Sequence, residues 1–244
     1  MDVFLAGTYS RPYLIESDSK IMILESFYYV SNWMDDFIKN HWNFLLDSGA
    51  FTFMGNVRKG DNIDWDEYLS NYIDYINKLD IKLFFELDID LIVGIKEVER
   101  LRLRLEKETN KKSIPVWHKE RGIDYWNKMV DEYDYVAIGG IVSNEIKRKE
   151  YPIFTNLLNI AFKSSCKVHG LGFTNMKGLS NYKFHSVDST AWTYGNRGGF
   201  LYHFNGKKVI KIDKPKGTKL EAKAVAIHNF NEWVKFQNYA KNNL

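Results

Sequence analysis

Short apolar runs alternate with longer amphipathic segments along most of this chain. Seven of the short runs are rich in β-branched and aromatic residues, and they span residues 3–7, 44–49, 83–88, 114–118, 135–140, 167–172 and 184–188. Between several of them apolar residues recur at helical spacing, over residues 68–76, 98–105, 125–130 and 153–162. Strands that alternate with helices predict a parallel α/β sheet, and nearly continuous apolar strands indicate that both faces of the sheet are covered.

Seven strand candidates within about 190 residues favour a (β/α)8 TIM-like barrel over a doubly wound open sheet. The C-terminal part has a different pattern, because Asn205-Gly206 separates two alternating runs and predicts a β-hairpin over residues 199–212. Helical periodicity then predicts a closing helix over residues 218–242. We therefore expect one barrel domain over residues 1–244, with the hairpin and the helix as C-terminal additions.

The composition narrows the class of protein. With 34 basic and 31 acidic residues the chain is neither histone-like nor an acidic tail, although this balance is compatible with a local basic patch. The single cysteine, Cys166, excludes an intramolecular disulfide and a multi-cysteine metal site, and it favours a reducing compartment. No apolar run approaches the roughly 20 residues that span a bilayer, and residues 1–5 lack the basic region of a signal peptide. We expect a soluble, cytoplasmic protein that does not bind a membrane.

Polar or glycine residues stand where six of the predicted strands end. They are Asp47, Asp88, His118, Gly139-Gly140, His169 and Asp188. In a barrel these ends form one rim, and the active sites of barrel enzymes lie there. Each residue alone has a simpler explanation, such as a helix cap, a turn or a buried histidine. Three carboxylates gathered at strand ends cost free energy of desolvation and repulsion unless they have a function, so together they predict an active or binding site. The alternation of apolar and acidic residues over 86–90 does not decide which of Glu86, Asp88 and Asp90 faces the predicted site.

The order of these motifs resembles that of the tRNA-guanine transglycosylase superfamily, which includes phage-encoded relatives that place 7-deazaguanines in DNA. Asp47-Ser48-Gly49-Ala50-Phe51 is similar to the family's Asp-Ser-Gly-Gly-Phe, and Phe85-Glu86-Leu87-Asp88 is similar to the strand end with which the family recognises the base. Residues 139–145 are similar to the family's Gly-Gly-Leu-Ala-x-Gly-Glu. Val168-His169-Gly170-Leu171-Gly172 is similar to its next strand, which has a histidine and glycines, and residues 188–198 are similar to its nucleophile motif. They keep the family's order and, with the hairpin, cover residues 44–212.

The resemblance implies a glycosyl transfer in which guanine is exchanged for a 7-deazaguanine such as preQ0, as in the queuosine-related enzymes. It implies that Asp188 forms a covalent bond to the sugar and that Asp47 moves a proton to and from the base. It also implies a base-binding pocket formed by Ser48, Gly49, Phe51, Asp88, His118, Gly139, Gly140 and His169.

A nucleic-acid substrate requires stacking surfaces and basic side chains. We expect the target base to be flipped out and stacked on Trp117, Trp192, Tyr194 or Phe51. The side chains expected to contact the nucleic acid are Lys119, Arg121, Trp192, Asn196, Arg197, Lys207 and Lys208. For the lysines of the hairpin, the simpler explanation is a solvated edge that discourages strand pairing.

The departures from the family pattern also matter. The family's zinc site needs three cysteines and a histidine, so we expect neither a metal nor another cofactor here. The strand that supplies a base-contacting glutamine ends in Trp117-His118. A short chain without zinc resembles the DNA-acting, phage-type relatives more than the tRNA enzymes, and a protein partner or a second copy could supply binding surface.

Three alternatives stay open. One is a tRNA-guanine transglycosylase, and another is a barrel enzyme for a phosphorylated sugar that uses residues 195–199 as a phosphate loop. The third is a nucleic-acid-binding barrel without catalysis.

Overall fold

Eight parallel strands form one curved sheet in the computed structural model, which describes residues 1–14, 21–40, 43–50, 52–53, 63–214 and 216–244. The strands are β1 (Asp2–Ala6), β2 (Ile23–Ser26), β3 (Phe44–Asp47), β4 (Leu83–Phe84), β5 (Val116–Trp117), β6 (Tyr135–Ile138), β7 (Lys167–Gly170) and β8 (Ser186–Ser189). Their order is β4-β3-β2-β1-β8-β7-β6-β5, so β1 pairs with both β2 and β8.

A single parallel bridge between Phe85 and Ile114 joins the two ends of this sheet. The amide of Ile114 donates to the carbonyl of Phe84 at 2.8 Å, and the amide of Glu86 donates to the carbonyl of Ile114 at 3.1 Å. The strands therefore follow one another around a ring, which is the TIM-like barrel predicted from the sequence rather than an open sheet. The eighth strand, β2, is the one that the sequence pattern did not predict.

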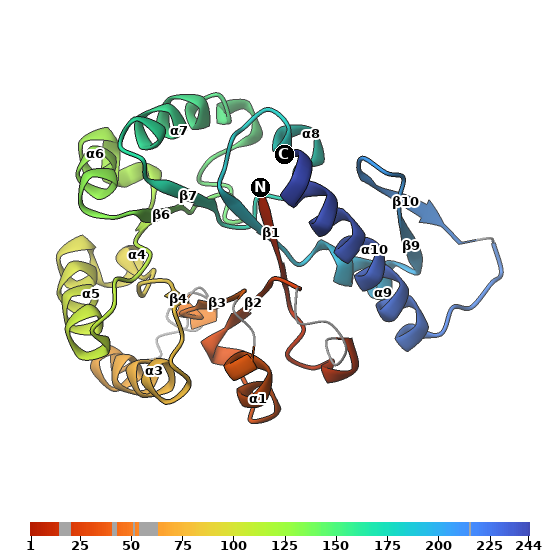
Figure 1. Cartoon of the computed structure of the whole chain (residues 1–244), viewed down its shortest axis with the longest axis horizontal. Helices are drawn as coiled ribbons and strands as arrows, with labels where there is room; N and C mark the ends of the chain where they lie inside the picture. The colour runs from red at the N-terminus through yellow and green to blue at the C-terminus, as the bar shows by residue number, and fades with distance from the viewer. Residues whose placement is uncertain (15–20, 41–42, 51, 54–62, 215) are drawn as a thin grey trace.

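The long helices α3, α5, α6 and α7 lie on the outside of the curved sheet (Figure 1). The helices are α1 (Trp33–Asn40), α3 (Trp65–Leu79), α4 (Asp90–Val93), α5 (Ile95–Thr109), α6 (Gly122–Glu132), α7 (Ile153–Lys163), α8 (Met176–Leu179), α9 (Tyr194–Gly198) and α10 (Ala222–Asn243). Helix α3 begins where the carboxylate of Asp64 accepts the amide of Glu67, and it buries the stripe that includes Tyr72 and Ile76. None of the helices among the described residues combines the length and the apolar character needed to cross a bilayer.

Two apolar clusters divide the core, and the smaller one contains strand and strand-end residues only. It includes Phe4, Leu24, Leu45, Val116 and Ala137, and it fills the inside of the barrel, whereas the larger cluster packs the strands against the helices. Side chains alternate along a strand, so the residue two positions after an inward one also faces inward.

This alternation sets the direction of the next residues along three strands. It directs Asp47 inward after Leu45, His118 inward after Val116, and Gly139 inward after Ala137. The barrel therefore presents these residues to one space at its carboxyl end.

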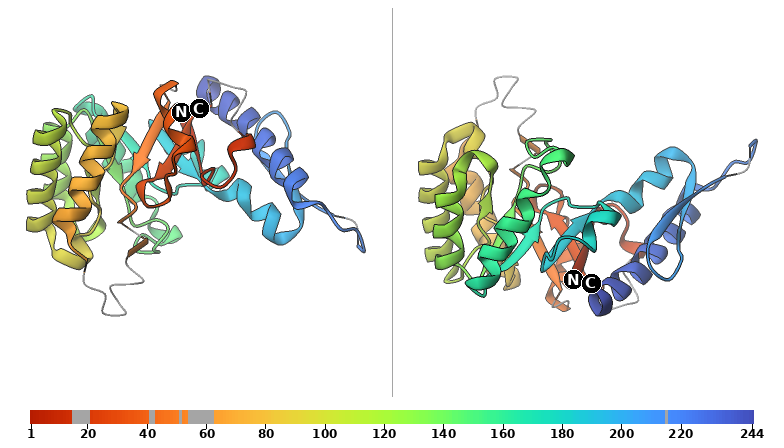
Figure 2. Two further views of the ribbon diagram at one scale, coloured as in Figure 1. Left: turned by 90° about the horizontal axis from the view of Figure 1, so that it is seen from below. Right: turned by 90° about the horizontal axis from the view of Figure 1, so that it is seen from above.

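The C-terminal additions are present as the sequence predicts. A turn at Asn205-Gly206 joins β9 (Phe200–Phe204) to β10 (Val209–Asp213), and α10 follows. The hairpin stands outside the ring of strands, next to α10 (Figures 1 and 2). The amide group of Gln237 on α10 donates to the carbonyls of Val3 at 2.6 Å and Met22 at 2.9 Å, so this helix is fastened to β1 and to the start of β2.

Candidate active site

A cavity of about 400 Å³ lies at the carboxyl ends of the barrel strands. Asp47, Asp88 and Asp188 line it, together with His118 and the Gly139-Gly140 pair. These residues come from four strand ends and from a loop that are far apart in the sequence. The structure thus brings together most of the residues that the strand-end pattern singled out.

Asp47 is the last residue of β3, and its carboxylate accepts the amide of Gly49 at 3.2 Å. Burial raises the pKa of Asp47 to about 7, and the nearby charges of Asp88 and Asp188 act in the same direction. A carboxyl group that titrates near neutral pH can both give and take a proton under ordinary conditions. Asp47 is therefore suited to acid and base catalysis.

The backbone after Asp47 needs a glycine. Gly49 has a φ of 76°, and a Cβ there would lie 2.7 Å from the Ser26 hydroxyl and 2.8 Å from the Cβ of Tyr28. Ser48 is buried outside the cavity wall, and its carbonyl accepts the hydroxyl of Tyr68 at 2.6 Å. Ser48 and Gly49, expected to touch the base, instead shape the chain that carries Asp47. Phe51 lies outside the described residues.

Asp88 faces the cavity and is paired with His118, whose Nε2 lies 2.7 Å from Asp88 Oδ1. On the other side of the ring, Nδ1 lies 2.7 Å from Glu145 Oε2. Burial by itself lowers the pKa of His118, but the charge of Asp88 and the hydrogen bonds to both carboxylates outweigh it and raise the pKa to about 10. His118 is thus a cation held between two carboxylates.

Gly139 and Gly140 make room for this arrangement. A Cβ on Gly139 would lie 2.8 Å from the His118 ring, and a Cβ on Gly140 would lie 2.7 Å from a carboxylate oxygen of Glu145. The φ of Gly140 is 78°, which also favours glycine. Both glycines line the cavity, so their main chain is available to a ligand.

The two acidic residues that flank Asp88 in the sequence, Glu86 and Asp90, do not line the cavity. Glu86 is fully buried and pairs with Arg102 at 2.9 Å and Arg121 at 3.0 Å, while Asp90 pairs with Arg121 at 2.8 Å. Only 3% of the Arg121 side chain is exposed. The expectation that Arg121 contacts a nucleic acid is therefore wrong, because its guanidinium is occupied by these two carboxylates.

The cluster of Asp88, Asp90 and His118 is the candidate for a metal ion among the described residues, with ligand atoms within 4.8 Å of one another. Its atoms already have partners, since His118 binds Asp88 and Asp90 binds Arg121. The positive guanidinium and the protonated imidazole beside it oppose a second cation. The donor set therefore does not fit a metal.

The side chain of Asp188 lies on the inward side of β8, and two hydrogen-bond donors hold its carboxylate. Its Oδ1 accepts the amide of Gly172 at 2.6 Å and lies 3.2 Å from Nε2 of His169. His169 is fully buried inside the barrel and lies behind Asp188 as seen from the cavity, rather than on the cavity wall. The structure therefore places His169 in contact with Asp188 and not with a base.

The tryptophans expected to stack on a base are in the core. Trp192 is fully buried, donates its indole N–H to the carbonyl of Ala6 at 2.8 Å and packs against Phe230, and Trp117 is buried as well. The expectation that either one stacks on a nucleic acid is wrong. A tertiary contact with α10, which the local sequence does not show, buries Trp192.

Tyrosines take the place of these tryptophans around the cavity. Tyr9, Tyr29 and Tyr194 line it, with Tyr29 41% and Tyr194 52% exposed. The rings of Tyr9 and Tyr29 are stacked with centroids 4.6 Å apart. Tyr9 and Tyr29 were not singled out from the sequence, although the aromatic run Phe27-Tyr28-Tyr29, shortly after the apolar residues 21–24, was a usable signal.

Glu25 is a further cavity residue that the sequence did not indicate, because β2 was not predicted. Its carboxylate is buried and accepts the amide and the hydroxyl of Thr8. Burial raises the pKa of Glu25 to about 7 against the effect of these hydrogen bonds. Four carboxyl groups therefore line the cavity among the described residues.

The expected phosphate contacts are dispersed. Lys119 pairs with Glu150, and Lys207 and Lys208 are exposed at the turn of the hairpin, which stands outside the barrel (Figure 1). Asn196 and Arg197 belong to α9, but their side chains lie outside the described part of the structure.

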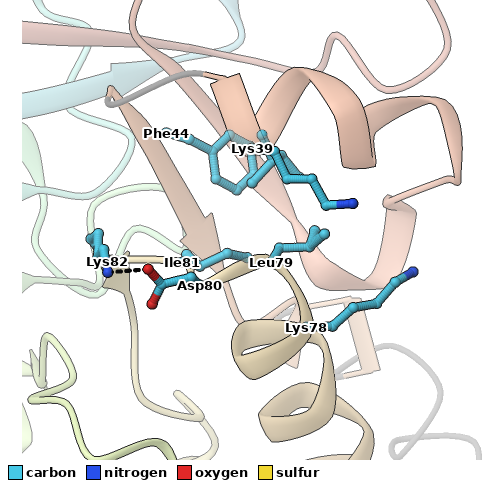
Figure 3. Close-up of a pocket in the computed structure, with 8 residues that line it drawn as sticks. Lys39, Phe44, Lys78, Leu79, Asp80, Ile81 and Lys82 are labelled. Carbon is cyan, nitrogen blue, oxygen red and sulfur yellow. Dashed lines mark hydrogen bonds and ion pairs between the residues drawn. The ribbon is translucent and has the colours of Figure 1, made fainter.

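A second cavity of about 430 Å³ lies at the opposite end of β3 and β4, near Phe44 and Ile81 (Figure 3). Two of its three lysines have carboxylate partners, since Lys78 pairs with Asp35 at 2.6 Å and Lys82 pairs with Asp80. Its lining contains no grouping of unpaired acids and bases among the described residues, so the cavity with the three aspartates is the candidate active site.

No protein-family model matches the chain, and no curated protein is similar to it in sequence.

Proposed function

We propose that the protein is a nucleic-acid guanine transglycosylase, which exchanges guanine for a 7-deazaguanine base, with DNA as the favoured polymer. The observation that carries this proposal is the pair Asp47 and Asp188 in one cavity. The two are close enough for the charge of Asp188 to raise the pKa of Asp47, yet their hydrogen-bonding environments differ. Two carboxyl groups in different environments can divide the roles of nucleophile and acid between them.

In the first half of the reaction, a carboxylate oxygen of Asp188 attacks C1′ of the target nucleoside. The C1′–N9 bond breaks, its electron pair stays with the departing guanine, and protonated Asp47 gives that base a proton. The product is an ester between Asp188 and the sugar, as in retaining glycosidases.

In the second half, N9 of the incoming 7-deazaguanine attacks C1′ and the ester bond breaks, which returns Asp188 as a carboxylate. The N9 proton of the incoming base goes to Asp47, which was left ionised by the first half. The protein ends in its starting protonation state, and neither water nor a cofactor is consumed.

The other polar groups of this cavity suit the edge of a guanine. Asp88 supplies carboxylate oxygens for the N1–H and the exocyclic amine, and His118 holds that carboxylate from behind at 2.7 Å. The main chain at Gly139-Gly140 lies on the same cavity and offers polar atoms to the base carbonyl.

The cavity volume of about 400 Å³ is suited to a base and its sugar rather than to a polymer segment. The base must therefore leave the helical stack before it reaches Asp188. Tyr29 and Tyr194 are exposed at this cavity, and aromatic side chains stabilise an unstacked base by about 1–3 kcal/mol. These tyrosines favour a nucleic-acid substrate.

A sugar-phosphate substrate fits the cavity less well. Among the described residues the lining includes four carboxyl groups, of Glu25, Asp47, Asp88 and Asp188, and no lysine or arginine that would hold a phosphate dianion. Residues 195–199 fall mainly in α9, a helix of five residues that leads to the hairpin and supplies no phosphate loop.

The test is incorporation of radiolabelled guanine or 7-deazaguanine into duplex DNA, single-stranded DNA and tRNA. The wild type and the exposed control Asp213→Asn should incorporate label, whereas Asp188→Asn should incorporate none and form no covalent complex on a denaturing gel. Label in DNA alone supports the favoured polymer, and label in tRNA alone assigns the tRNA substrate. No incorporation into any of the three by the wild type contradicts the proposal.

A further inference from the structure

A line of hydrogen-bonded polar side chains runs through the inside of the barrel and ends at Asp188. The hydroxyl oxygens of Tyr135 and Ser186 are 2.5 Å apart, and the Ser186 oxygen is 2.5 Å from Nδ1 of His169. Nε2 of His169 is 3.2 Å from Asp188 Oδ1. The four residues come from the adjacent strands β6, β7 and β8.

The surroundings of this line are apolar. His169 and Ser186 are fully buried, and the His169 ring lies against Phe85, with centroids 5.3 Å apart, and against Phe4. Polar groups in such an interior are costly unless every one is hydrogen-bonded, and here each one has a partner. Apart from Ser186, the inward side chains around His169, such as Phe4, Phe85 and Ala137, are apolar, so packing alone does not require a histidine here.

A carboxylate at Asp188 and a single proton on the His169 ring give one consistent direction of hydrogen bonds along the line. An ionised Asp188 only accepts, so Nε2 of His169 carries the proton of that bond. In a neutral imidazole Nδ1 is then an acceptor, and it takes the proton of the Ser186 hydroxyl. Ser186 in turn accepts from Tyr135, and burial raises the pKa of Tyr135, which keeps its hydroxyl protonated.

The hydrogen bonds also select one oxygen of the carboxylate. Both of those that reach Asp188 from the described residues, from Gly172 and from His169, end on Oδ1. Asp188 itself lines the cavity, so Oδ2 is the oxygen left for the substrate.

We propose that His169 is the positioning residue for Asp188, and that Ser186 and Tyr135 hold it in the Nε2–H tautomer so that Asp188 presents Oδ2 to the sugar. This inference rests on the proposed function, because it assigns Asp188 as the nucleophile. His169 does not touch the substrate, so its loss should slow the attack on C1′ and leave binding of the free base unchanged.

The kinetic test uses Ser186→Ala, Tyr135→Phe and His169→Gln, with Tyr133→Phe as the matched control. Tyr133 is also a buried tyrosine, but its hydroxyl binds Glu106 and its ring lies on Arg102, away from the line inside the barrel. For a metal ligand, losing the partner that orients it lowers activity by about 10–100-fold, and an effect of the same order is expected for the orientation of Asp188. We expect such a fall in the rate of covalent complex formation at saturating nucleic acid, an unchanged KM for the free base, and the wild-type rate in Tyr133→Phe.

A second measurement is independent of activity. In ¹⁵N-histidine NMR spectra, His169 is assigned among the six histidines by its loss in His169→Gln. We expect a protonated Nε2 and a bare Nδ1 in the wild type, and a mixture of tautomers in Ser186→Ala. A protonated Nδ1 in the wild type, or wild-type complex formation in all three barrel variants, overturns the inference. If the wild type forms no covalent complex, the proposed function fails, and the NMR result alone decides whether His169 holds Asp188 as inferred.

Discussion

Asp47 and Asp88 reach one cavity from the ends of neighbouring strands, and the charge of Asp88 is among the causes that raise the pKa of Asp47 to about 7. Asp88 itself is paired with protonated His118 at 2.7 Å. Asp47 has no such cation among the described residues and takes a hydrogen bond from the Gly49 amide. The two carboxyl groups are therefore placed for different roles, with Asp47 able to hold a proton.

The pH dependence of exchange should follow Asp47. In the proposed reaction the departure of guanine needs Asp47 protonated, so the single-turnover rate should fall about tenfold per pH unit above about 7. Asp47→Asn should lower the rate by about 100-fold or more and remove this dependence. Single-turnover rates of both proteins measured from pH 5.5 to 9 test this prediction. If the rate of Asp47→Asn falls with pH as steeply as that of the wild type, another group gives the proton to guanine.

Stability should also depend on Asp47. An unfolded aspartate loses its proton near 3.8, whereas Asp47 in the folded protein keeps its proton up to about 7. Between these values the folded state binds more protons, so its stability falls as the pH rises. The free energy of unfolding of Asp47→Asn should therefore be about 2–4 kcal/mol larger than that of the wild type at pH 8, and no larger at pH 4. Urea unfolding at both pH values tests this, with Asp213→Asn as the exposed control, and equal stabilities at pH 8 contradict it.

Glu145 should hold His118 in its charged form. The raised pKa means that the ion pairs of His118 are fully present below about 6.5 and are lost as the pH rises through about 10. Glu145→Gln removes one of the two carboxylates, so His118 should lose its proton at a lower pH, and base affinity should weaken with it. An NMR titration of His118 together with base-binding measurements checks this. The exposed neighbour Glu120→Gln should leave both quantities as in the wild type.

Gly49 should tolerate no side chain. Gly49→Ala places a methyl group 2.7–2.9 Å from Ser26 and Tyr28, whereas Gly94→Ala meets nothing within 4 Å at a similar φ of 81°. The pair thus separates crowding from backbone strain. Overpacking costs about 1–3 kcal/mol, so Gly49→Ala should lose that much more stability than Gly94→Ala in thermal unfolding. Equal losses would show that crowding adds nothing.

Tyr29 should stabilise the flipped-out nucleotide. Tyr29→Ala should weaken binding of single-stranded nucleic acid by about 1–3 kcal/mol while the affinity for free base stays the same. Fluorescence anisotropy with a labelled oligonucleotide measures the first quantity. Exposed Phe162 on α7 is the control, because Phe162→Ala removes an aromatic ring that does not line the cavity. An equal loss in both variants would mean that Tyr29 is not specific to the site.

The inward carboxylates could be predicted because each follows an apolar strand whose alternation is visible in the sequence. Asp47 follows Leu45 at the same parity, and the inward His118 follows Val116 in the same way although it is not a carboxylate, so local pattern and barrel geometry agree. The barrel itself was predictable for the same reason, since strands and helices alternate over most of the chain.

The residues that were misjudged depend on partners distant in the sequence. Arg121 looked like a surface cation, but Glu86, 35 positions earlier, takes its guanidinium into the core. Trp192 looked like a stacking surface, but Phe230 on α10 covers it. Glu25 was missed because the short apolar run that forms its strand was not recognised as a strand, and its partner Thr8 lies 17 positions earlier. No local pattern shows such contacts.

The bonds from Gln237 to Val3 and Met22 have a consequence for the order of folding. While the chain is still emerging from a ribosome, the first two strands exist, but the amide group that ties them together has not been synthesised. The hydrogen bond from the Thr8 hydroxyl to Glu25 at the cavity edge depends on the position of those two strands. The cavity should therefore form only after translation has passed Gln237, so that termination before this residue yields a chain that contains every aspartate of the cavity but lacks the bonds that complete it.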